Sequence, residues 1–116
     1  MEEKKRVEPI RLKFKDGKEY VLEFSRGSVE EAEDNGFKRF DFVDKIMKRT
    51  TEIFYFAFKM HHPEITKEET DKILFEDIGG MPDGMLDRLT DLFNAPYDSL
   101  INETGKPKNA NLTILM

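Results

Sequence analysis

The first regular pattern along the chain is a strict alternation of apolar and polar residues between positions 9 and 25. The apolar members are Ile10, Leu12, Phe14, Tyr20, Leu22 and Phe24. Between the two halves, "KDGK" supplies Asp16 and Gly17, which accept the positive φ of a tight turn. The pattern therefore predicts a β-hairpin over 9–25 with one apolar face and one charged face.

Helical spacing replaces the alternation after the hairpin. Ser28 with Glu31, and Thr66 with Glu69, have the spacing of capping boxes, while Pro63 is a stop signal. Together with the apolar spacing, these signals predict four helices. Their expected bounds are 28–36, 41–62, 66–78 and 83–95.

The second of these helices is expected to be the long central one, with Asp41 as its cap. Its apolar residues recur at helical spacing and would form the buried face. They are Val43, Ile46, Met47, Thr50, Ile53, Phe54, Ala57 and Met60. The whole pattern predicts a single α+β domain over 1–100, in which a hairpin precedes a mainly helical part. Residues 101–116 are expected to form a flexible C-terminal tail.

Composition limits the partners of this domain. The 116 residues carry a net charge of -5, which disfavours binding to phosphate backbones and anionic lipids. Nucleic acid is therefore not an expected partner. A membrane is not expected either, because no apolar run approaches the roughly 18 residues that span a bilayer. The absence of cysteine excludes disulfides, thiolate zinc sites and cysteine nucleophiles. A soluble protein without a signal peptide is expected.

The two histidines, His61 and His62, are adjacent and pose the question of a metal or catalytic site. Neighbours on a helix point about 100° apart, whereas paired helical ligands sit at i and i+4. Imidazoles at a helix C-terminus instead meet the negative end of the macrodipole, and Pro63 follows them directly. The pair is therefore interpreted as a helix end.

Other enzyme signatures are also lacking. "GGMPDG" has neither the lysine nor the hydroxyl residue of a phosphate-binding loop, and it follows a predicted helix rather than a strand. The carboxylates cluster in first turns and exposed faces, where solvated acids are normal. We therefore expect no catalytic residue, no cofactor and no metal.

An aromatic surplus marks the segment "TEIFYFAFKM". Phe54 and Phe56 lie about 200° apart around a helix axis, Tyr55 falls between them, and Phe58 returns near Phe54. A helix that is apolar all round is covered either by the rest of its own domain or by another molecule. The residues alone leave both possibilities open.

Two further features favour a partner. Met81 and Met85 flank the glycine-rich "GGMPDG", and methionine adapts to irregular apolar surfaces. The apolar end "NLTILM" follows a polar linker and is either a docking segment or a frayed end. The candidate partner-binding residues are Phe54, Phe56, Phe58, Met81 and Met85, chosen on chemistry alone.

The order of these elements resembles the small tail assembly chaperones of long-tailed bacteriophages, prophages and gene transfer agents. The resemblance is carried by "IRLKFKDGKEYVLEFS", by a short acidic helix ending in "EDNGF", and by "TTEIFYFAFKMHHPEITKEETDKILFEDIGG". It covers residues 8–95, and "HPEIT" after an aromatic helix is its strongest part.

The resemblance implies a self-associating protein of the host bacterial cytoplasm that binds the apolar tape measure protein and keeps it soluble during tail tube assembly. The tail tube protein is a second implied partner, and the chaperone would be absent from the mature virion. Such families commonly also make a longer form by ribosomal frameshifting. The alternative function is a small structural tail or head-tail connector protein that remains in the virion.

Overall fold

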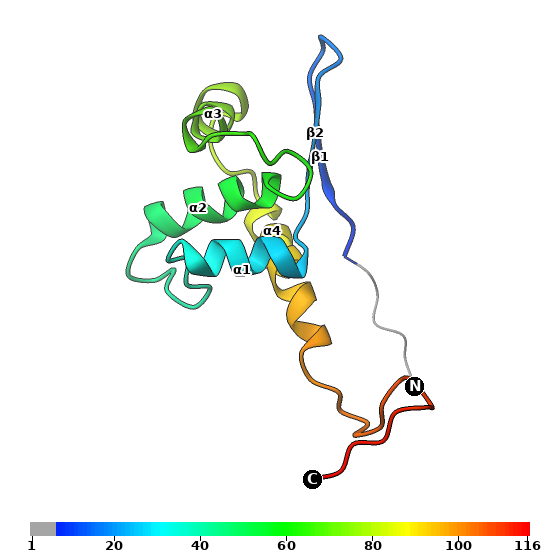
Figure 1. Ribbon diagram of the computed structural model, residues 1–116. Helices are drawn as coiled ribbons and strands as arrows, with labels where there is room; N and C mark the ends of the chain where they lie inside the picture. Colours follow the sequence, from blue (N-terminus) through cyan, green and yellow to red (C-terminus); the bar gives the residue numbers. More distant parts are fainter. Residues whose placement is uncertain (1–6) are drawn as a thin grey trace.

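The computed structural model describes residues 7–116 and has the α+β architecture that the sequence predicts. A two-stranded antiparallel hairpin precedes four α-helices, two of which continue into a short helix of another type (Figure 1). The elements are β1 (Ile10–Lys13), β2 (Glu19–Leu22), α1 (Arg26–Asp34), α2 (Ile46–Phe58), α3 (Lys67–Lys72), η1 (Ile73–Ile78), α4 (Met85–Asn94) and η2 (Ala95–Ser99).

The hairpin forms at the predicted place. Its register pairs Ile10 with Leu22 and Leu12 with Tyr20, so the alternating apolar residues share one face. Gly17 has φ +94°, the left-handed conformation that the turn requires. The apolar face packs against the helices, whereas the turn of the hairpin points away from them (Figure 1).

The first helix begins earlier than predicted, because a different serine caps it. The Ser25 hydroxyl accepts the Ser28 N–H at 3.1 Å, and the Ser28 hydroxyl accepts the Ser25 N–H at 2.8 Å. The predicted Ser28 and Glu31 capping box is therefore wrong, since Ser28 occupies the third helical position instead of the cap. Gly36, with φ +88°, lies in the turn after the helix end at Asp34.

The central helix α2 is shorter than the predicted 41–62 and starts at Ile46. Asp41 does not cap it, because its carboxylate accepts from Arg49 at 3.2 Å instead. Phe42 turns inward and meets Phe37 edge to face. The residues between Asp41 and α2 therefore form a turn, and α2 starts without a side-chain cap.

The remaining helices follow their sequence signals closely. The Thr66 and Glu69 capping box is present, and α3 continues through the π-helical η1 to Gly79, whose φ of +88° ends it. α4 continues through η2, which ends at Ser99. Residues 101–116 contain neither helix nor strand and run away from the helices (Figure 1). None of the helices described between residues 7 and 116 has the length and apolarity needed to cross a membrane.

The aromatic half of α2 is the centre of the core. Phe54, Phe56 and Phe58 are each 5% exposed or less, with the hairpin, α1, α3 and α4 packed around the helix. Of the two possibilities that the sequence left open, the structure shows the first, in which the rest of the domain covers this half of the helix. The prediction of Phe54, Phe56 and Phe58 as exposed partner contacts is wrong. The hairpin contributes to this cover, because Tyr20 contacts Phe58 edge to face.

The two histidines fasten the hairpin to the end of α2. His62 Nε2 accepts the Val21 N–H at 3.0 Å, and His61 Nε2 lies 2.9 Å from a Glu23 carboxylate oxygen. The Glu23 N–H also donates to the Ala57 carbonyl. These bonds occupy the outer edge of β2, which would otherwise be open to another strand.

Stability should depend on the protonation of His62, because only the neutral ring can accept the Val21 N–H. Burial and the neighbouring His61 lower the pKa of His62 below its ordinary 6.5. Near pH 6.5 the unfolded chain then binds more protons than the folded one, so the contribution of His62 is complete above that pH and falls as the pH drops below it. In His61→Gln, where His62 is the sole histidine, the free energy of unfolding should decrease between about pH 7 and pH 5.5.

The matched control is the double variant with His61→Gln and His62→Gln, which should show no histidine-dependent change over the same interval. Urea unfolding followed by circular dichroism measures both. Equal pH profiles for the two proteins would contradict the hydrogen bond.

Candidate binding surface

Four strongly exposed apolar side chains lie just before and at the start of α2. Phe40, Val43, Ile46 and Met47 are between 67% and 93% exposed. They belong to residues 38–48, here called the 38–48 segment. Four large apolar side chains exposed within eight residues of sequence indicate a candidate interaction site, whereas single exposed apolar residues are ordinary.

The 38–48 segment is held by residues that alternate with its exposed ones. Phe37 precedes it and is buried against Phe93, with ring centroids 4.9 Å apart. Arg39 donates to the Asn94 side chain at 2.7 Å, which ties the segment to α4. Phe42 packs against the core. These inward contacts leave the intervening side chains facing outward.

A buried ion pair fixes the other end of the segment. The Arg49 side chain is only 3% exposed and donates to Asp41 and to Glu52. Removing one partner of such a pair leaves an uncompensated charge, which typically costs about 3–5 kcal/mol. Arg49 Nε is the one buried side-chain nitrogen or oxygen in residues 7–116 without a hydrogen-bond partner.

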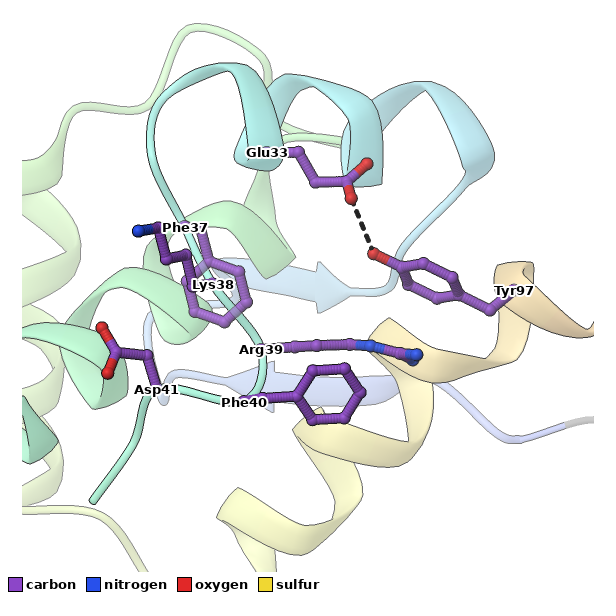
Figure 2. Close-up of a pocket in the computed structure, with 7 residues that line it drawn as sticks. All are labelled: Glu33, Phe37, Lys38, Arg39, Phe40, Asp41 and Tyr97. Carbon is purple, nitrogen blue, oxygen red and sulfur yellow. Dashed lines mark hydrogen bonds between the residues drawn. The ribbon is translucent and has the colours of Figure 1, made fainter. Parts of the chain in front are cut away.

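A pocket of about 630 Å³ opens beside the segment, between the end of α1 and η2 (Figure 2). The Arg39 guanidinium lies between two rings, 3.9 Å from the Tyr97 centroid and 4.4 Å from the Phe40 centroid. Such cation–π contacts contribute about 0.5–1 kcal/mol each at exposed sites. They place Arg39 and Phe40 side by side in the wall of the pocket.

Tyr97 closes the pocket from the other side. Its hydroxyl donates to a Glu33 carboxylate oxygen at 3.0 Å (Figure 2). Burial raises the pKa of Tyr97 above its ordinary 10.0, and the hydrogen bond to Glu33 acts in the same direction. Tyr97 is therefore neutral at physiological pH and serves as a donor. The wall of the pocket therefore contains a guanidinium group, aromatic faces and apolar carbon atoms.

The predicted contact residues lie elsewhere. Phe54, Phe56 and Phe58 are core residues, and Met81 and Met85 are partly buried against that core. The exposed Val43, Ile46 and Met47 belong to the face predicted to be buried. Charge in the sequence could have distinguished the exposed N-terminal half of α2 from its buried C-terminal half. Lys45 and Lys48 lie at the N-terminal half, whereas residues 53–58 carry no charge.

No assembled metal site accompanies these residues. Between residues 7 and 116, no group of three or more His, Asp or Glu side chains is arranged to hold an ion.

Arg39 should control the order of the 38–48 segment. Arg39→Met keeps the aliphatic stem but loses the aromatic stacking and the bond to Asn94, together worth about 1–2 kcal/mol. Amide hydrogen exchange at Asp41, whose N–H donates to the Lys38 carbonyl, should then accelerate by up to roughly 5- to 30-fold, while α4 keeps its protection.

Arg11→Met is the matched control, since among residues 7–116 the side chain of Arg11 pairs with Glu19, on the exposed face of the hairpin. It should leave exchange in the 38–48 segment unchanged. Unaltered exchange in Arg39→Met would show that the stack does not hold the segment.

The comparisons with known proteins give a family. Searches of curated proteins and of solved structures found no match. A family described as a domain of unknown function, DUF5055, matches residues 3–116, which is nearly the whole chain. The chain therefore belongs to the DUF5055 family.

Proposed function

We propose that the chain is a tail assembly chaperone that self-associates and binds the apolar tape measure protein of a long-tailed phage or prophage. The observation that carries the proposal is the 38–48 segment, whose exposed apolar side chains are held in place by Arg39 and Arg49. A rigid apolar surface is what a protein needs in order to cover the apolar stripe of a helical partner.

The size of the surface fits repeated weak contacts. Fully burying a Phe, Met, Ile or Val side chain is worth about 1.5–3 kcal/mol, before the cost of association is subtracted. One copy would therefore bind an apolar helix weakly. Many copies along a long tape measure protein add avidity without any new contact.

The net charge supports the same proposal. Each copy carries a charge of -5, so a partner coated by many copies becomes strongly charged and stays dispersed. The order of sequence elements from 8 to 95, with "HPEIT" after the aromatic helix, supports the identity of the partner class. We place this activity in the host cytoplasm before the virion is complete, with the tail tube protein as the next component to arrive.

Co-expression with the tape measure protein encoded by the same genome tests the proposal. The wild-type chain should keep that protein in the soluble fraction. Phe40→Asp combined with Met47→Asp should reduce the soluble yield about tenfold or more, because two apolar contacts are replaced by charges. Both residues are exposed, so the variant should fold, as circular dichroism would check.

Leu115→Asp is the matched control, since it places the same charge on an exposed apolar residue of the tail. It should retain full rescue. Loss of rescue in Leu115→Asp but not in the double variant would move the binding site to the tail.

Mass spectrometry of purified particles separates the chaperone from a structural tail or head-tail connector protein. The chaperone should be scarce in mature virions, because it is displaced as the tube forms. Stoichiometric amounts in the virion would overturn the chaperone proposal.

A further inference from the structure

The start of α2 has a charge pattern that opposes its own stability. Lys45 occupies the N-cap position, Lys48 lies in the first turn, and no acidic residue is present there. Cations at a helix N-terminus face the positive end of the macrodipole, which costs about 0.3–1 kcal/mol each. Arg49 is neutralised by Asp41 and Glu52, whereas the ammonium groups of Lys45 and Lys48 form no ion pair within residues 7–116.

These lysines flank the exposed apolar side chains. The 38–48 segment carries four basic residues against two acidic ones, on a chain whose net charge is -5. One of the two acids, Asp41, is already occupied by Arg49. The segment is therefore an apolar surface with a basic rim.

A complementary surface lies on α3 and η1. Phe75 is 51% exposed, although large aromatic residues are usually buried, and it lines a shallow cavity of about 630 Å³ together with Glu68 and Glu76. Residues 64–77 carry six acidic residues against two basic ones. Glu69, Asp71 and Lys72 also line the cavity, so four acidic residues and one basic residue surround Phe75. Neither Glu68 nor Glu76 forms an ion pair within the described residues, and the rim is mainly acidic.

We propose that the 38–48 segment of one copy docks against the α3 and η1 face of a second copy. Apolar side chains would meet at the centre, with Phe75 against the exposed residues near the start of α2. At the rim, Lys45 and Lys48 would pair with carboxylates such as Glu68 and Glu76. The charges select this pairing, because either face set against its own copy would bring like charges together.

The contact joins two different surfaces of the same chain. If the pairing is reciprocal, two copies form a closed dimer in which each copy uses both surfaces. If the pairing is not reciprocal, each copy binds the next one head to tail, which gives a ring or an open chain. The inference deepens the self-association part of the proposed function and rests on it. Because docking would cover the 38–48 segment, a second copy and the tape measure protein would compete for that segment. It also explains why Lys45 and Lys48 occupy positions that weaken the helix to which they belong.

Charge reversal tests the contact. Lys45→Glu with Lys48→Glu gives the chain two acidic faces, and Glu68→Lys with Glu76→Lys gives it two basic faces. In sedimentation velocity at low salt, the wild-type chain should form assemblies larger than the monomer, whereas each variant alone should be monomeric. Mixing the variants in equal amounts should restore assembly, because opposite faces are again available.

Restoration in the mixture is the decisive result, since a misfolded variant could not produce it. The acidic variant should also unfold at the same or a higher temperature than the wild type, because carboxylates at the start of α2 suit its macrodipole. A wild-type chain that stays monomeric at all concentrations, variants that still assemble alone, or a mixture that stays monomeric would each overturn the inference.

The solubility assay keeps this inference separate from the proposed function. If the charge-reversed variants are monomeric but still rescue the tape measure protein, the self-docking surface stands and is not needed for binding. If the wild-type chain assembles as described but rescues nothing, the docking inference survives and the chaperone function fails.

Discussion

The structure depends on covering the aromatic half of α2 from every side. Phe54 and Phe58 share one side of the helix and Phe56 points to the opposite side, so no single neighbouring layer can bury them all. The hairpin supplies the missing cover, with Tyr20 against Phe58. His61 and His62 then hold the hairpin at the end of α2. These polar contacts therefore help to keep the hairpin packed over the core.

This closure divides α2 into two halves with different roles. The C-terminal half is enclosed, whereas Ile46 and Met47 at the N-terminal end remain exposed. The covering elements gather around the aromatic residues, and the chain before α2 is occupied with anchoring contacts through Arg39 and Arg49. Exposed apolar side chains are thus concentrated at one end of a helix whose other end lies in the core.

The exposed end of α2 and the surface around Phe75 carry charges of opposite sign. Lys45 and Lys48 sit where a helix gains nothing from cations, while the carboxylates around Phe75 have the opposite sign on a separate element. Local rules of stability are most often broken at sites under another constraint. An apolar surface with a charged rim also discriminates between partners better than an apolar surface alone, because unpaired charges penalise the wrong contact.

Local signals in the sequence determined the hairpin, the Thr66 capping box and the glycine end after η1, because turn and cap preferences act over a few residues. They also determined that an apolar helix lies at the centre. Lys45 and Lys48 mark the charged half in the sequence, but the tertiary structure decided how completely the other half is buried, because that depends on where the hairpin docks. The contact of Arg39 with Asn94 and that of Asp41 with Arg49 depend on distances between separate segments, which periodicity does not encode.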